Sequence, residues 1–145
     1  MTIEFRPLLP GHLGTIAAQP EQQLEQVSMI EPAYEALLVA GKAEGAWVGP
    51  RIVAAAGLAI MIPGELAIAW CLLSPRAGRY MASITKRCRR VLFDDPITRV
   101  EMWVNTDIQH GERWALALGF TRETVNPLRK RGKGGKDQHV FARVR

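Results

Sequence analysis

Apolar and polar residues alternate along Thr98–Asn105, where Val100 and Val104 fall on the same face of the chain. A period of two residues predicts a β-strand with one buried face. After a turn, the segment ending at Gly119 predicts a short helix, because glycine just past a helix readily adopts the left-handed backbone that closes it. Phe120 is then expected to fold back onto the last helical turn.

The same two periods divide the rest of the chain into strands and helices. Strands are expected at Thr2–Leu8, Gly45–Val48, Ile52–Ile62, Glu65–Leu73, Thr121–Asn126 and His139–Val144. Helices are expected at Gly11–Gln19, Pro20–Met29, Glu31–Ala40 and Arg79–Phe93. The helices are expected to bury apolar stripes that include Leu24, Val27, Tyr34, Leu37 and Leu38.

Three of these strands follow one another with only short turns between them. The Gly49-Pro50 and Pro63-Gly64 turns predict antiparallel hairpins. Ile52–Ile62 and Glu65–Leu73 are apolar almost throughout, as expected for central strands that are covered on both faces. The pattern therefore predicts an α/β fold with helices on both sides of the sheet.

The length and composition are those of one globular domain. The chain has 145 residues, of which 48% are hydrophobic and 23% charged. Its longest apolar run, Ile52–Pro63, is too short to span a bilayer, and the N-terminus does not resemble a signal peptide, so we expect a cytoplasmic protein. Cys71 and Cys88 lack metal-ligand spacing, which favours unbridged thiols in a reducing compartment and no metal site.

The order of the elements, the opening IEFRPLLPGHLGTI and the ending LALGF at 116–120 resemble the GNAT superfamily of N-acyltransferases. The resemblance covers nearly the whole chain. It implies one GNAT-like domain over residues 1–145, built on a mixed, mostly antiparallel twisted sheet with helices on both faces. It also implies acetyl-CoA as the cofactor and an amine of a small molecule or protein as the acceptor.

In this family the fourth strand leads into a glycine-containing loop whose backbone N–H groups hold the coenzyme's pyrophosphate at a helix N-terminus. The corresponding segment here is SPRAGRYMAS at 74–83, which lacks the family's glycine spacing. Arginine side chains could pair with phosphate instead. The alternative is a solvated basic turn. The resemblance gives these candidate cofactor residues: Leu73, Arg76, Gly78, Arg79, Ala82 and Asn105.

The chemistry of the family needs a base for the acceptor amine and often a tyrosine that protonates the leaving thiolate. Ala115 stands at the position of that tyrosine. Glu65, Glu101 and His110 are the candidate catalytic residues, and each has an alternative as a solvated side chain. Asn105 has an alternative role in a turn or as a helix N-cap.

A run of cations near the C-terminus is a separate feature. The chain carries a net charge of +5, and the expected loop Arg129–Asp137 concentrates positive charge without interleaved aromatic residues. Such a mobile basic tip suits nucleic-acid phosphates or an acidic protein, and the alternative is a solvated loop. The candidate partner-binding residues are Arg129, Lys130, Arg131, Lys133 and Lys136.

Two classes of function remain open. The first is an acetyl-CoA-dependent N-acyltransferase. The second is a catalytically degenerate GNAT-fold protein that binds protein or nucleic acid, because the segment VEMWVNTDIQHGERWALALGF also resembles small GNAT-like proteins of bacteriophages, including an internal virion protein. In that case the partners could be other virion proteins and the protein would reside in the virion. Oligomer formation is possible, with Trp47, Trp70 and Trp103 either as interface anchors or as core residues.

Overall fold

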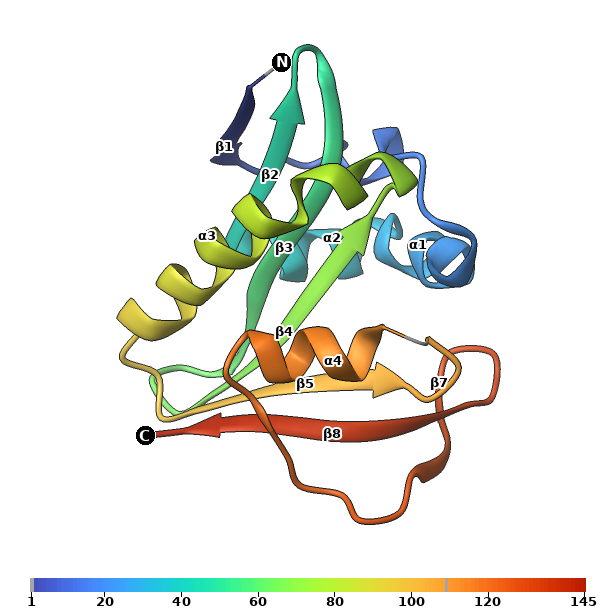
Figure 1. The fold of residues 1–145 in the computed structure, drawn as a ribbon, viewed down its shortest axis with the longest axis vertical. Coiled ribbons are helices and arrows are strands. Elements are labelled where there is room, and N and C mark those ends of the chain that lie inside the picture. The colour runs from blue at the N-terminus through green and yellow to red at the C-terminus, as the bar shows by residue number, and fades with distance from the viewer. Residues whose placement is uncertain (1, 109) are drawn as a thin grey trace. The chain divides into compact units, whose positions relative to one another are not determined.

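The computed structural model describes residues 2–108 and 110–145 (Figure 1). The strands pair in the order β1-β2-β3-β4-β5-β8-β6, and β7 pairs with β8. The chain divides into two compact units, one of Met1–Ala59 and Trp70–Arg87, the other of Ile60–Ala69 and Cys88–Arg145. The predicted α/β class with a mixed, mostly antiparallel sheet is confirmed, and the strand of residues 66–73 is central, as expected.

The first unit begins with a three-strand meander and two helices. Its elements are β1 (Ile3–Pro7), α1 (Gln23–Met29), α2 (Pro32–Ala40), β2 (Lys42–Val48) and the start of β3 (Arg51–Ile62). β1 and β2 are antiparallel, and so are β2 and β3. Gly49 has a φ of +58° in the turn between β2 and β3, a conformation that glycine adopts without strain. The predicted hairpin is therefore confirmed.

The core of the first unit joins its helical segments to its strands. Leu13, Met29 and Leu38 pack in one cluster with Trp47 of β2 and with other buried side chains. In β3 the consecutive residues 52–55 are all buried, so both faces of that strand are covered, as its continuous apolar sequence predicts. Trp47 is 8% exposed and belongs to this core, so the suggestion that it anchors an interface is wrong.

One helix prediction for the first unit is wrong, because Gly11–Gln19 contains only the short 3₁₀ helix η1 (Leu13–Thr15). The expected helix Pro20–Met29 is present, as the 3₁₀ helix η2 (Pro20–Gln22) followed directly by α1. Leu24 and Val27 of α1 are exposed rather than buried. The polar side of α1 faces inward instead, because the amide of Gln26 donates to backbone oxygens of η1 and of the residue after it. In α2, Leu38 is buried as predicted, whereas Tyr34 and Leu37 are exposed.

β4 (Leu66–Leu73) leads through the 3₁₀ helix η3 (Pro75–Tyr80) into α3 (Met81–Asp94). α3 begins two residues later than the expected Arg79, because the preceding residues form the tighter 3₁₀ turn. Ile84 and Leu92 of α3 are buried. None of the helices in the described part of the chain is both long and apolar enough to cross a bilayer.

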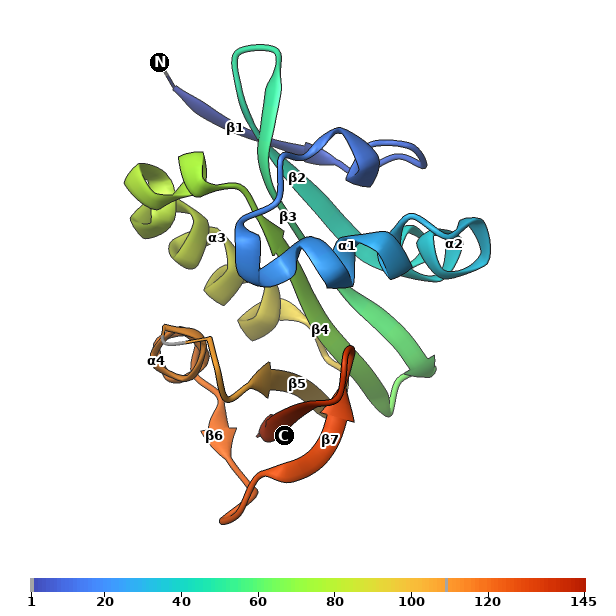
Figure 2. The same ribbon diagram turned by 90° about the vertical axis from the view of Figure 1, so that its right-hand side faces the viewer.

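The second unit is built around β5 (Arg99–Asn105) and β8 (Lys136–Val144). β5 pairs in parallel with residues 66–69 of β4 and antiparallel with residues 138–144 of β8. β6 (Thr121–Arg122) and β7 (Leu128–Gly132) both pair with β8 (Figure 2). The expected strand Thr121–Asn126 is therefore limited to two residues. The buried faces of Val100 and Val104 confirm the predicted alternation of β5.

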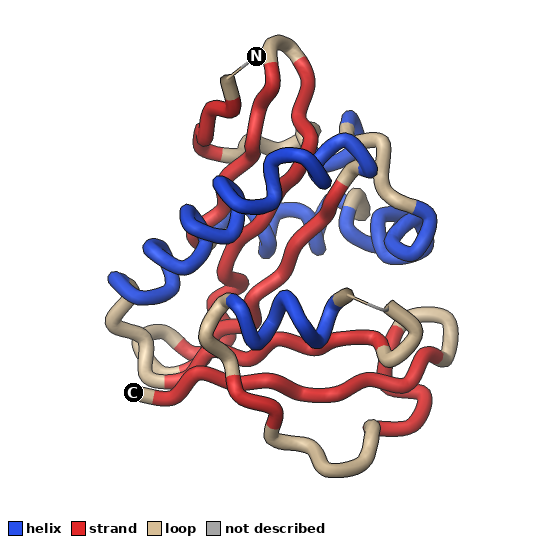
Figure 3. Tube along the Cα trace, viewed as in Figure 1, coloured by secondary structure: helices blue, strands red, loops and turns tan. Residues whose placement is uncertain are grey.

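The predicted closure of the helix before Gly119 is confirmed. α4 (Gly111–Ala117) follows β5, as the secondary-structure colouring of Figure 3 shows. Gly119 has a φ of +99°, its N–H donates to Leu116 O, and the N–H of Phe120 donates to Ala115 O. This pair of bonds is the Schellman motif, and it turns the 3% exposed Phe120 into the core of the unit.

Candidate functional site

The turn after β4 is fixed by a capped 3₁₀ helix. Ser74 is 4% exposed, and its Oγ accepts a hydrogen bond of 3.1 Å from Arg76 N. Ala77 N donates to Ser74 O at 2.9 Å, and the side chain of Ala77 is fully buried. Pro75 occupies the first helical position, where its missing N–H costs nothing. The N–H groups of Arg76 and Ala77 are thus used within the turn and do not form an open glycine-loop cradle.

The three candidate cofactor residues of η3 are Arg76, Gly78 and Arg79, and all are exposed. A Cβ atom added to Gly78 would contact nothing within 4 Å, so the backbone between the two arginines is open to an approaching group. The guanidinium groups of Arg76 and Arg79 are thus exposed on this turn, and such groups form charge-assisted hydrogen bonds with anions. Ala82 is exposed on the first turn of α3.

Leu73 ends β4 beside the N-terminal segment rather than at an open backbone edge. Its N–H donates to the side-chain oxygen of Gln22 at 2.8 Å, and its carbonyl accepts from Gln19 N at 2.8 Å. Gln22, 5% exposed, also donates to Cys71 O. These bonds fix the end of β4 immediately before Ser74.

Cys71 and Cys88, both described, are half-buried thiols that form no disulfide.

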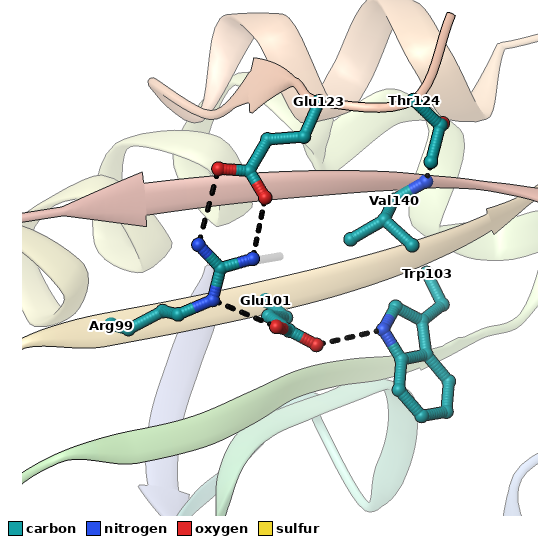
Figure 4. Close-up of polar contacts among 6 residues, drawn as sticks. All are labelled: Arg99, Glu101, Trp103, Glu123, Thr124 and Val140. Carbon is teal, nitrogen blue, oxygen red and sulfur yellow. Dashed lines mark hydrogen bonds and ion pairs between the residues drawn. The ribbon is translucent and has the colours of Figure 1, made fainter.

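In the second unit, Arg99 joins two carboxylates (Figure 4). Its Nε donates to Glu101 at 2.8 Å, and its terminal nitrogens donate to both carboxylate oxygens of Glu123. Glu101 also accepts a bond of 3.1 Å from Trp103 Nε1. The hydrogen bonds to Glu123 and then to Glu101 raise the pKa of Arg99, and Arg99 lowers the pKa of Glu123. Both oxygens of the candidate base Glu101 are therefore engaged.

The other two candidate catalytic residues are exposed. Glu65 lies in the turn before β4 rather than in the strand, where its carbonyl accepts from Arg99 N at 2.9 Å. His110 is the N-cap residue of α4, and its side chain makes no capping hydrogen bond. Neither side chain has a hydrogen-bond partner among the described residues.

Asn105 is buried within the second unit. Its Oδ1 accepts from Gln138 Nε2 at 2.8 Å, and its backbone oxygen accepts from Ile108 N. A Cβ atom on Gly132 would lie 2.8 Å from Asn105 Oδ1 and 2.9 Å from Gln138 Nε2, so a larger residue there would displace these two side chains. Gln138 Oε1 is buried and has no partner among the described residues. The N-cap of α4 is His110 and not Asn105, so the N-cap alternative is wrong, whereas Asn105 does open a turn through the bond from Ile108 N.

The prediction of a loop at Arg129–Asp137 is wrong, because the basic segment forms a strand and a turn. Residues 129–132 belong to β7 and Lys136 opens β8, because an edge strand accommodates charged side chains while its backbone pairs with β8. Arg131 lies over the ring of Trp103, with 4.4 Å between its guanidinium carbon and the ring centre. Lys136 pairs with Asp107 at 2.6 Å. The side chains of Arg129, Lys130 and Lys133 are exposed.

Sequence reasoning missed Ser74, Glu123 and Gln138. The Ser-Pro pair before a helix was a readable signal for the cap at Ser74. Glu123 lies 24 residues from Arg99 and Gln138 lies 33 from Asn105, so no local pattern reveals those partners. The described residues contain no group of three or more His, Cys, Asp or Glu side chains able to hold a metal ion.

Comparison with known proteins identifies the fold. No family model matches the sequence, and no curated protein matches it. Among solved structures, the chain is similar to Ard1 from Thermoplasma volcanium, with a TM-score of 0.74 and 13% identity over 99% of this chain and 98% of that one. It is similar to the PaiA N-acetyltransferase of Thermoplasma acidophilum in complex with coenzyme A, with a TM-score of 0.69 and 14% identity over the full length of both.

A GNAT-family acetyltransferase from Bacillus anthracis gives a TM-score of 0.70 and 11% identity over 98% of this chain and 94% of that one. At such identities the likeness concerns the path of the backbone and not the side chains of a site. The chain thus has the fold of the GNAT acetyltransferases.

Proposed function

We propose that the protein is a GNAT-type N-acyltransferase that transfers an acetyl group from acetyl-CoA to an amine of a small molecule or protein. The observation that carries the proposal is the exposed Arg76–Arg79 turn, which directly follows the central strand β4 in a fold shared with acetyltransferases. One of the similar structures is a complex with coenzyme A. Fold alone does not assign function, so the proposal depends on this turn.

The turn is assigned to the phosphates of the coenzyme. Arg76 and Arg79 would hold them through charge-assisted hydrogen bonds, and the absence of a side chain at Gly78 leaves room for close approach. Ser74 would act indirectly, by fixing the turn on which both arginines stand. When bound, acetyl-CoA supplies the acetyl group as a thioester.

His110 is assigned as the base that accepts the proton of the acceptor amine. Its side chain is exposed and makes no capping bond, and imidazole is well suited to accept a proton near neutral pH. Glu101 is less suited, because Arg99 and Trp103 occupy its two oxygens. Glu65 is the second candidate base, since its exposed carboxylate is not engaged by the described residues.

One observation favours the second candidate function, a GNAT-fold protein that binds partners without acyl transfer, such as a bacteriophage virion component. Ala115 stands where the resemblance implies a catalytic tyrosine, and it is fully buried. A methyl group cannot protonate a leaving thiolate. Under this alternative, the protein would not turn over acetyl-CoA with any amine.

Calorimetry with acetyl-CoA and with coenzyme A tests the proposal without knowledge of the acceptor. Arg79→Glu should weaken binding by about tenfold or more, because a charge-assisted hydrogen bond contributes about 1.5–3 kcal/mol. The matched control is Arg51→Glu, which changes the same charge at another exposed position and should leave the affinity unchanged. Absence of binding by the unaltered protein would support the second candidate, and equal affinity of the two variants would remove the phosphate assignment.

A further inference from the structure

We propose that the hairpin of β7 and β8 is a binding surface for the phosphate backbone of nucleic acid. Five of the nineteen Lys and Arg residues fall between Arg129 and Lys136, with no acidic residue among them. This surface is defined by residues 129–136 and lies wholly within the second unit. It is independent of the acyl-transfer proposal, since it involves none of the residues assigned there.

The hairpin is a folded element that presents its charges from a defined backbone. β7 pairs with β8 from Leu128↔Gln138 to Gly132↔Lys136. Lys130 has a φ of +54°, and its N–H donates to Asp137 Oδ1 at 2.8 Å. The backbone therefore needs little ordering on binding, which lowers the entropic cost of recognition.

The five cations differ in what they contact. Lys136 is paired with Asp107, whose hydrogen bond raises the pKa of the lysine, and Arg131 lies on Trp103. Arg129, Lys130 and Lys133 make no ion pair or side-chain hydrogen bond with any described residue. Each of these three can release counterions from a polyanion without first breaking a contact within the protein.

The backbone of β7 argues against a peptide partner. An acidic peptide that added a strand to the sheet would need a regular row of free N–H and C=O groups. Between Leu128 and Gly132 the register with β8 shifts, and the positive φ of Lys130 distorts the strand there. Bulges and lysines on an edge strand discourage such pairing. What remains is recognition by side-chain charge, which suits a phosphate backbone and predicts no base specificity.

The test is fluorescence anisotropy of a labelled, random-sequence DNA duplex with the full chain, between about 50 and 200 mM salt. We expect affinity to fall steeply with salt. The triple variant Arg129→Gln, Lys130→Gln, Lys133→Gln should reduce the magnitude of the slope of log affinity against log salt concentration by about three units, one for each cation removed. Lys130→Asn alone, which tolerates the positive φ, should lower it by about one unit.

The matched control is the triple variant Lys86→Gln, Arg89→Gln, Arg90→Gln, which removes the same charge from exposed positions of α3 and should keep most of the slope. Equal losses in both triple variants would mean that net charge alone drives binding, and would overturn the proposal. Displacement of the duplex by polyglutamate of equal charge would instead indicate an acidic protein. Displacement by coenzyme A would place the surface in a nucleotide site, and no binding at the lowest salt would reject it.

Discussion

Arg99 of β5 connects the carboxylates of Glu101 and Glu123. It donates two hydrogen bonds to Glu123, and these lower the pKa of that carboxyl group. The folded state then holds the proton of Glu123 less tightly than the unfolded chain does. The contribution of the pair to the free energy of unfolding is therefore complete above the ordinary glutamate pKa of about 4.3 and is lost as pH falls through the lowered value.

Glu123→Gln should accordingly flatten the dependence of stability on pH in the acid range. The side chain of Glu123 is 41% exposed, so solvent screening limits the effect to about 1 kcal/mol or less. Urea denaturation at about pH 6 and about pH 3.5 measures it. The unaltered protein should lose more unfolding free energy between the two pH values than the variant, and identical losses would show that the pair contributes nothing.

The role of a residue can be predicted from the sequence only when that role depends on neighbouring positions in the chain. Gly119 was predictable because a helix end requires a left-handed residue at that position. Gln22 was not, because its amide bonds to the backbone of Cys71 and Leu73, about 50 positions along the chain. The same holds for Glu123 as the partner of Arg99.

Among the elements, β3 and its neighbours show how a small residue sets the distance between backbones. A Cβ atom on Gly57 would lie 2.4 Å from Lys42 O and 3.0 Å from both Ala43 Cα and the Trp70 ring. Backbone atoms cannot move away as a flexible side chain can. Gly57→Ala should therefore lower the free energy of unfolding by about 1–3 kcal/mol through overpacking.

Thermal or urea unfolding checks that value, with Gly14→Ala as the matched control. A Cβ atom on Gly14 would make only an ordinary contact of 3.8 Å with Ile30, so its effect should be small or slightly stabilising. Equal stability of the two variants would mean that β2 and β3 adjust without cost.

The helices and strands were predicted correctly where the apolar pattern of the sequence matches the buried positions of the structure, and wrongly where it does not. The apolar strands β3 and β4 and the alternating β5 match their expected ranges closely. The orientation of α1 was missed because periodicity defines a stripe but not the surface it faces, and here Gln26 bonds inward while Leu24 and Val27 are exposed. β7 was missed because its composition is that of a loop, whereas its pairing with β8 is a long-range contact.

At the scale of the whole molecule, the expectation of one domain over residues 1–145 remains a prediction. The two compact units are not consecutive segments of sequence. β3, β4 and α3 each begin in one unit and end in the other. Neither unit can lose these elements without disrupting the other, so we expect a single cooperative unfolding transition.

Amide hydrogen exchange of paired glycine variants tests that cooperativity. Gly119→Ala places a side chain on a residue whose φ is +99°, although the added Cβ atom would have no neighbour within 4 Å. The variant should lower the free energy of unfolding by about 1 kcal/mol through backbone strain in the second unit. If the chain is one cooperative domain, this cost should lower the opening free energy of the slowest β2 amides in the first unit as much as that of the β8 amides. Conversely, Gly57→Ala in the first unit should lower the opening free energy of the slowest β8 amides in the second unit. Faster exchange confined to the unit that carries the substitution would instead establish two domains, because each would then open without the other.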